Sequence, residues 1–254
     1  MSLPKPYYHD ESCTIYLGET REILPQLDKV DMIFTDPPYG HNNNNGDLIH
    51  NREAALGLAP SCESDRQARP IANDGEEANE LVQWFFAQAA DMLRHGGCCC
   101  CCCGGGGGPD PQFARWSLWL DEHLDFKQMV VWDKGPMGMG WHYRRSYETV
   151  LVAQKPGAAC KWYDETDRIE NIIRHIGKII PQKTDHPTPK PPELSAHFIA
   201  LHTRSGETVL DPFMGGGSTA QAAKLLGRRF IGIEIEEKYC EIAVRRLGQE
   251  VLPL

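Results

Sequence analysis

The 254-residue sequence lacks any apolar run approaching the ~20 residues that a helix needs to cross a membrane. Its first residues, Met1–Glu11, are polar and of mixed charge, which is not the pattern of a secretory signal. We therefore expect a cytoplasmic protein without a membrane partner. Basic residues are also scarce relative to acidic ones: the net charge is −9, so any contact with nucleic acid must be confined to a local surface.

The ten cysteines lack the spacing of a disulfide framework. Six are consecutive, Cys98–Cys103, and the others are Cys13, Cys62, Cys160 and Cys240. A metal site is the alternative reading of the run, but neighbouring side chains of a strand point to opposite faces, and no CxxC pair or nearby histidine cluster accompanies it. We therefore predict a buried structural strand of small apolar thiols, followed by a loop at Gly104–Gly108.

Strand-like and helix-like segments alternate along the chain. Strands are expected at Cys13–Leu17, Val30–Thr35, Cys98–Cys103, Phe126–Trp132, Thr149–Ala153, Thr208–Leu210 and Arg229–Ile233. Helices are expected at Glu19–Leu27, Glu76–Arg94, Pro109–Leu124, Leu194–His202, Ser218–Leu226 and Glu236–Leu247. This alternation predicts an α/β fold whose seven-stranded, mostly parallel sheet has helices on both faces. Residues 41–75 have no periodicity, and we interpret them as a mobile loop beside the active site.

A glycine-rich loop connects the strand at Thr208–Leu210 to the next helix. Asp211-Pro212 ends the strand, three glycines follow at Gly215–Gly217, and a helical pattern begins at Ser218. Such a loop brings backbone N–H groups close to a ligand. Glu234 lies about 20 residues further on, at the end of the next strand, where a carboxylate can accept hydrogen bonds from ribose hydroxyls. The segment indicates a nucleoside-cofactor site without choosing between NAD and another nucleoside.

The sequence Asp36-Pro37-Pro38-Tyr39 directly follows another predicted strand, so it lies at the edge of the sheet where ligands of open α/β sheets bind. Proline has no N–H, and this turn therefore presents acceptors, the Asp36 carboxylate and the Pro37 carbonyl, beside the flat ring of Tyr39. This combination suits the exocyclic amine of adenine or cytosine stacked on the tyrosine. Binding both amine hydrogens directs the nitrogen lone pair at an electrophile, so no serine or cysteine nucleophile is required.

Three motifs occur in the order TDPPYG (Thr35–Gly40), HPTPKP (His186–Pro191) and DPFMGGGST (Asp211–Thr219). In this order they resemble the S-adenosylmethionine-dependent DNA amino-methyltransferases of the beta group, and the resemblance extends from about Ile15 to Leu247. It implies a Rossmann-like fold in a single methyltransferase domain over residues 1–254. It also implies S-adenosylmethionine as the cofactor and double-stranded DNA as the substrate.

The resemblance also implies roles for individual residues. Asp36, Pro37, Pro38 and Tyr39 match the catalytic motif that holds a flipped base. The expected cofactor-binding residues are Glu19, Thr188, Lys190, Asp211, Phe213, Gly215, Gly217, Ser218, Thr219 and Glu234. Among them Lys190 would neutralise the cofactor carboxylate, and Glu19 stands where the family usually has aspartate, which weakens that assignment.

Target recognition in this family usually comes from the region before the HPTxKP segment, here residues 135–185. Cations modestly outnumber acids in this region although the whole chain is acidic, and a solvated charged loop is an equally good interpretation. The expected DNA contacts are Tyr143, Arg144, Arg145, Lys161, Arg174 and Lys178.

The sequence thus predicts methyl transfer to N6 of adenine, because aspartate begins the catalytic motif and serine is commoner in cytosine-N4 enzymes. The alternatives are an N4-cytosine methyltransferase, a non-catalytic nucleic-acid-binding relative, and an NAD-dependent oxidoreductase that would leave two of the motifs unexplained. A homodimer and a cognate restriction endonuclease are possible partners, and no metal is expected.

Overall fold

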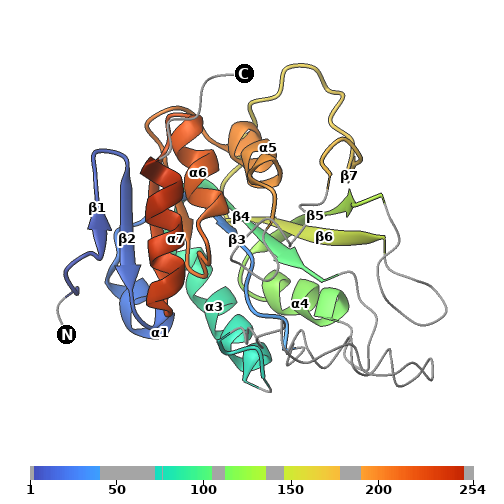
Figure 1. Cartoon of the computed structure of the whole chain (residues 1–254). Helices are drawn as coiled ribbons and strands as arrows, with labels where there is room; N and C mark the ends of the chain where they lie inside the picture. The colour runs from blue at the N-terminus through green and yellow to red at the C-terminus, as the bar shows by residue number, and fades with distance from the viewer. Residues whose placement is uncertain are drawn as a thin grey trace, which may run out of the picture.

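The computed structural model describes residues 3–40, 72–75, 77–104, 112–135, 146–177 and 190–248. Within them, nine strands form one mixed sheet in the order β1-β2-β9-β8-β3-β4-β6-β5-β7 (Figure 1). The strands are β1 (Tyr8–His9), β2 (Cys13–Leu17), β3 (Val30–Thr35), β4 (Leu93–Cys103), β5 (Asp125–Asp133), β6 (Tyr147–Gln154), β7 (Ile172–Ile173), β8 (Thr208–Asp211) and β9 (Arg229–Glu234). Neighbours from β2 to β4 pair in parallel, whereas β6 is antiparallel to both β4 and β5.

Helices cover both faces of the sheet, as predicted. One face packs against α5 (Pro192–His202), α6 (Ser218–Leu225) and α7 (Glu237–Gly248), and the other against α1 (Thr20–Ile23), α3 (Ala78–Met92) and α4 (Gln112–Asp121). A short 3₁₀ turn, Leu24–Gln26, follows α1. The predicted three-layer α/β architecture is therefore confirmed.

All seven predicted strands are present, and the sheet adds two strands that the sequence did not predict. Both of these, β1 and β7, have only two residues and lie at the sheet edges. Two residues are too few for a recognisable alternation, and their pairing depends on the neighbouring strand.

The boundary between α3 and β4 differs from the prediction. The helix was expected to continue to Arg94 and to end at His95-Gly96-Gly97, but α3 stops at Met92 and β4 already begins at Leu93. The prediction was wrong because parallel pairing of Leu93 with Val30 extends the strand backward, with a register shift before Cys98 pairs with Met32. Gly97 allows this close approach, since a Cβ there would lie 2.8 Å from the Asp31 carbonyl oxygen.

The six consecutive cysteines form the buried second half of β4. Cys98, Cys100 and Cys102 face the α5–α7 side, and the alternate residues face the α3–α4 side. Because both faces are covered by helices, a continuous run of small apolar side chains satisfies the strand. The prediction of a buried cysteine strand is confirmed.

The adjacent strands β3 and β8 lie where the strand order of the sheet reverses, because the connections that leave them run toward opposite edges of the sheet. From β3 the chain passes through α3 to β4 on one side, and from β8 it passes through α6 to β9 on the other. Ligands of open α/β sheets bind in the crevice beyond the carboxyl ends of such a strand pair. Within the described part of the chain, no helix is both long and apolar enough to cross a membrane.

Candidate active site

One cavity of about 290 Å³ lies beyond the carboxyl ends of β3, β8 and β9. It brings together the two motifs that are furthest apart in the sequence. Asp36–Tyr39, which follow β3, line one part, and Pro212–Gly216 and Glu234 line another. The structure therefore places Tyr39 and Gly215 on the same cavity, as the sequence predicted.

The Asp36 carboxylate is held by two donors in this cavity. Its Oδ1 accepts a hydrogen bond of 2.5 Å from the Tyr39 hydroxyl, and its Oδ2 accepts one of 2.6 Å from Lys190 Nζ. Burial and the adjacent Asp36 charge raise the pKa of Tyr39, so its hydroxyl remains a proton donor. Each Asp36 carboxylate oxygen is thus held by a hydrogen bond from a residue that lines the cavity.

Lys190 lies among carboxylates in this structure. Its Nζ lies 3.2 Å from Glu148 Oε2 as well as 2.6 Å from Asp36 Oδ2, and 5.2 Å from the centre of the Tyr39 ring. Burial alone would lower the pKa of Lys190, but the charges of Asp36 and Glu148 outweigh it and raise that pKa. Lys190 is therefore a permanent cation beside the Asp36 carboxylate.

Nothing in the sequence indicated that Glu148 belongs to this site. It lies in β6, lines the cavity, and its Oε1 pairs with Lys134 Nζ at 2.6 Å. Burial alone would raise the pKa of Glu148, but Lys190 and Lys134 lower it to about 2. The only available sequence signal was a charged residue at the start of a predicted strand, and only the sheet order brings it beside Lys190.

Three further residues, all outside the motifs, position Tyr39. Asp74 Oδ1 accepts hydrogen bonds from the backbone N–H groups of Tyr39 (2.9 Å) and Gly40 (2.8 Å), and the Gln112 side chain donates to the Tyr39 carbonyl. The Trp116 ring packs against Tyr39 with centroids 5.8 Å apart. Residues of α4 and of the chain just before α3 therefore hold the Tyr39 backbone and ring in position.

The glycine loop adopts a conformation that larger residues would resist. Gly215 and Gly217 have φ of 53° and 78°, in the left-handed region that favours glycine. A Cβ at Gly217 would lie 2.6 Å from the Cβ of Ala243 in α7. These glycines let the loop turn tightly into α6 and leave its backbone open to the cavity.

Glu234 supports the loop from the end of β9. Its Oε2 accepts a hydrogen bond of 2.8 Å from the Gly215 N–H, and its Oε1 accepts one of 2.8 Å from the Glu236 N–H. Burial raises the pKa of Glu234 to about 7, although these N–H groups oppose the shift. Each carboxylate oxygen retains a second lone pair for a ligand hydroxyl.

Asp211 joins the two motifs instead of presenting both oxygens to the cavity. It is the last residue of β8, and its carboxylate accepts hydrogen bonds from Thr35 (2.8 Å) and Thr219 (2.7 Å). Burial raises the pKa of Asp211 to about 6. The last residue of the catalytic strand and the first turn of α6 are thereby fixed to one carboxylate.

Four of the remaining predicted residues line the cavity: Glu19, Phe213, Ser218 and Thr219. Arg246, which the sequence did not indicate, also lines it, and its guanidinium donates to the Ser218 hydroxyl at 3.1 Å. Thr188, Tyr143, Arg144, Arg145 and Lys178 lie outside the described residues, as does nearly all of the predicted loop at 41–75.

Two predicted DNA contacts lie elsewhere. Lys161 is engaged near the amino ends of the strands, where its Nζ pairs with Asp31 (3.0 Å) and Glu207 (2.5 Å). This end of the sheet is opposite to Asp36, so the structure does not bring Lys161 to the cavity. Arg174 is exposed and pairs with Glu170 at 2.6 Å.

Comparison with known proteins identifies the family of this chain. The sequence profile of the family described as DNA methylase matches residues 30–245. The chain is 41% identical to the DNA adenine methyltransferase YhdJ of Escherichia coli (strain K12), over 94% of this chain and 84% of that protein. It is 27% identical to the Type II methyltransferase M2.DpnII of Streptococcus pneumoniae, over 98% and 94% of the two chains.

Solved structures show the same fold. The M1.HpyAVI–SAM complex is 26% identical, with a TM-score of 0.63 over 93% of this chain and 100% of that one. PvuII DNA methyltransferase, which is cytosine-N4-specific, has a TM-score of 0.70 over 98% and 91% of the two chains at 17% identity, a likeness of fold alone. The chain belongs to the DNA methylase family, the S-adenosylmethionine-dependent DNA amino-methyltransferases of the beta group that its three motifs resemble.

Proposed function

We propose that this DNA methyltransferase modifies N6 of adenine in double-stranded DNA, with the base flipped out of the helix. The observation that carries the proposal is the Asp36 carboxylate, which lies with Tyr39 on the same cavity as the glycine loop. An exocyclic amine is a suitable ligand for these acceptors, since it has two hydrogens to donate. The 41% identity to a protein named as a DNA adenine methyltransferase favours adenine over cytosine.

The residues on the glycine-loop side fit a bound S-adenosylmethionine. A cavity wall of backbone groups at Gly215 and Gly216, with the Glu234 carboxylate beside them, can accept a nucleoside whose ribose hydroxyls donate to Glu234. When bound, this cofactor supplies a methyl group on a positively charged sulfur, which is the electrophile of the reaction.

On the substrate side, Asp36 and the Pro37 carbonyl orient the amine. In this structure the Tyr39 hydroxyl donates to Asp36 Oδ1, so an incoming amine hydrogen can either use the second lone pair of that oxygen or displace the hydroxyl. The Tyr39 ring then stacks on the base. Lys190 remains on Oδ2, where its ammonium holds the Asp36 carboxylate in position. The amine loses one proton after transfer, and we assign Asp36, which binds the amine, as the group that receives it.

Glu148 and Lys134 act on Asp36 through Lys190. The two carboxylates, Asp36 and Glu148, lie on either side of the Lys190 ammonium, at 2.6 and 3.2 Å. Glu148 thereby limits the positions that Lys190 can adopt, and Lys134 balances the second negative charge. We assign Glu148 as a positioning residue for the acceptor pair.

The experiment that tests the proposal identifies the methylated nucleoside. Unmethylated duplex DNA is incubated with the protein and methyl-labelled S-adenosylmethionine, then digested to nucleosides and separated. We expect the label in N6-methyladenine, and in no nucleoside with Asp36→Ala. Label in N4-methylcytosine would replace the adenine assignment with the alternative. Normal cofactor binding without any label in DNA would instead support a non-catalytic relative.

The proposal has further parts. Residues 135–185 recognise the DNA, the preferred substrate is double-stranded, and the protein acts as a homodimer with a cognate endonuclease. The Type II names of several relatives favour a role in restriction–modification. Mapping methylated positions in cells that express the protein, with and without a neighbouring endonuclease gene, tests that role.

A further inference from the structure

A group of soft metal-ligating side chains lies on the α5 side of β4, and the methyl-transfer site does not use it. Cys98 and Cys100 are two residues apart on the strand, so both point to the face that carries α5. Cys99 points to the opposite face. The sequence argument against a metal considered adjacent cysteines, whereas the structure brings together alternate ones.

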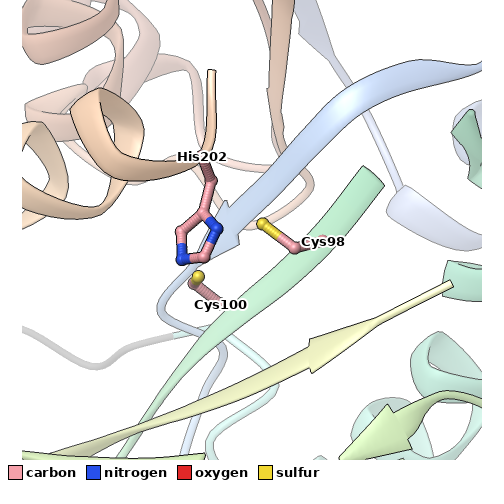
Figure 2. A group of neighbouring side chains, drawn as sticks. All are labelled: Cys98, Cys100 and His202. Atoms are coloured by element: carbon pink, nitrogen blue, oxygen red, sulfur yellow. The ribbon is translucent and has the colours of Figure 1, made fainter. Parts of the chain in front are cut away.

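His202 completes this group from a different element. It is the last residue of α5, is buried, and offers a ring nitrogen to the two thiols (Figure 2). One ligand atom from each of Cys98, Cys100 and His202 can be chosen so that all three lie within 4.8 Å of one another. Three candidate ligands thus converge at one point, although β4 and the end of α5 are about 100 residues apart in sequence. Only the tertiary structure brings these two elements together.

The imidazole of His202 is oriented by the backbone. Its Nδ1 lies 2.9 Å from the Lys161 carbonyl oxygen, and the Trp162 ring packs against it with centroids 5.4 Å apart. Metal-binding histidines commonly donate one ring N–H to a carbonyl, which orients the ring and leaves the other nitrogen for the ion. The contact with Lys161 is of this kind.

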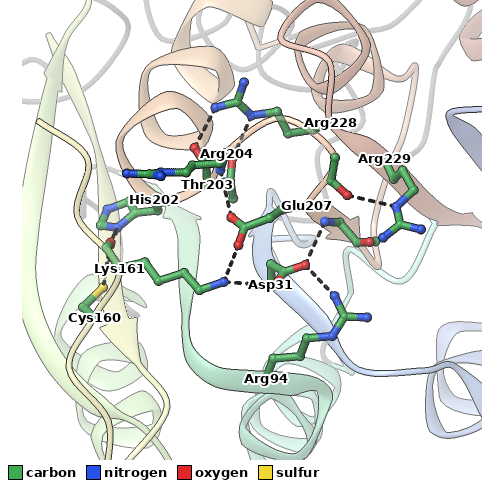
Figure 3. Close-up of polar contacts among 12 residues, drawn as sticks. Asp31, Arg94, Cys160, Lys161, His202, Thr203, Arg204, Glu207, Arg228 and Arg229 are labelled. Atoms are coloured by element: carbon green, nitrogen blue, oxygen red, sulfur yellow. Dashed lines mark hydrogen bonds and ion pairs between the residues drawn. The ribbon is translucent and has the colours of Figure 1, made fainter.

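A third thiol lies at the edge of the group. Cys160 Sγ is 3.5 Å from His202 Nδ1 and interacts with the Cys98 thiol. Cys160 precedes Lys161, whose ammonium pairs with Asp31 and Glu207, so this part of the chain is fixed against the amino ends of the strands (Figure 3). Its thiol lies outside the set of three mutually close ligand atoms, so Cys160 becomes a fourth ligand only if its side chain turns toward the Cys98 thiol.

We propose that Cys98, Cys100 and His202 bind a thiophilic metal ion of the zinc class, with Cys160 as the fourth ligand. Three sulfurs and one imidazole nitrogen are a common ligand set of closed structural zinc sites. At Zn–S distances of about 2.3 Å, tetrahedral ligand atoms lie roughly 3.8 Å apart, so the ligand atoms of Cys98, Cys100 and His202 need to approach one another by at most about 1 Å around the ion. None of these four residues lines the methyl-transfer cavity, so the ion would have a structural role.

The test measures metal in the whole protein. The chain is stripped with a chelator, incubated with Zn²⁺, freed of excess ion and analysed by elemental mass spectrometry. We expect one Zn²⁺ per chain in the wild type and in Cys99→Ala/Cys101→Ala, a control on the same strand but the opposite face. We expect none in Cys98→Ala/Cys100→Ala. Stoichiometry well below one in the wild type, or equal retention in both double variants, would overturn the proposal.

A spectroscopic readout guards against a variant that fails to fold. Co²⁺ in place of Zn²⁺ gives ligand-field bands that report tetrahedral geometry and a thiolate charge-transfer band that grows with the number of sulfurs. In wild-type protein we expect a tetrahedral spectrum, and in Cys160→Ala a charge-transfer band weaker by roughly a third. An octahedral spectrum would overturn the site, and an unchanged band would overturn Cys160 as its fourth ligand. Failure of this site would leave methyl transfer, measured on the same samples, unaffected.

Discussion

Two aspartates at opposite ends of β3 show how the same side chain serves different purposes. Asp31, near the amino end, is buried and accepts hydrogen bonds from Arg94 (2.5 Å), Lys161 (3.0 Å) and the Thr208 N–H (2.9 Å). Asp36, just beyond the carboxyl end, accepts hydrogen bonds from two side chains within the described part of the chain, Tyr39 and Lys190. The first carboxylate joins β3, β4 and β8, whereas the second faces a cavity.

The difference lies in whether the donors can be replaced. Burial alone would raise the pKa of Asp31, but the Thr208 N–H, Lys161 and Arg94 outweigh it and lower that pKa. One of the donors is backbone and cannot move away. The Tyr39 hydroxyl on Asp36 is a side-chain group that a substrate amine can displace. Stability is thus concentrated at one end of the strand and reactivity at the other.

The largest effect should come from removing the Asp36 carboxylate. We expect Asp36→Ala to lower the rate of methyl transfer by at least about 10³-fold, because the amine loses its charged acceptor. The melting temperature should change little, since Asp36 holds no strands together. Single-turnover assays and thermal melts measure the two quantities. A variant that retains wild-type rates would refute the role of Asp36.

The converse variant, Asp31→Ala, should reduce stability and spare the chemistry. Removing one member of a buried ion-pair group typically costs about 3 kcal/mol, and Lys161 would keep only Glu207. Because the folded pKa of Asp31 is lowered, its contribution is present above the unfolded pKa and is lost as the pH falls through the folded value. Urea unfolding of the wild type and of Asp31→Ala, at neutral pH and in acid, would measure this contribution as the difference between their free energies of unfolding. A difference of the same size at both pH values would contradict the prediction.

A smaller effect is expected for Glu148→Gln, which keeps the shape of the side chain but removes its charge. Among the described residues, Asp36 would then be the one carboxylate paired with Lys190. We expect the rate of transfer to fall about tenfold with cofactor affinity nearly unchanged. Lys134→Met, which removes the opposite partner of Glu148, provides a matched comparison. A loss confined to cofactor affinity would instead place Lys190 on the cofactor carboxylate, as the family resemblance implied.

The smallest effect concerns the pH dependence of cofactor binding. The ionised Glu234 is the better acceptor for ribose hydroxyls, and its pKa is about 7. We therefore expect affinity for S-adenosylmethionine to rise with pH through 7 and to be about tenfold weaker at pH 6 than at its plateau. Glu234→Gln should bind weakly with a flat profile near pH 7, which calorimetry can measure. A wild-type profile that is flat between pH 6 and 8 would remove Glu234 as the titrating group.

Much of the site was predictable because its residues lie in short segments that directly follow strands. Asp36-Pro37-Pro38-Tyr39 and the loop after Asp211 need only local sequence to form, and parallel strands bring their carboxyl ends to one edge. Glu148 and Asp74 were missed for the opposite reason. Their contacts in the site, Lys190 and Tyr39, lie in other segments of the chain, and the fold decides which segments become neighbours.

The sequence by itself determined the fold class, the strands of four or more residues and the two corners of the cavity, because periodicity, proline and glycine act within a few residues. Only the tertiary structure decided that Lys190 faces Asp36, that Glu148 lies beside them, and that alternate cysteines of one strand meet His202. These juxtapositions follow from the order of strands in the sheet and from where each helix ends, and neither is encoded in any single segment.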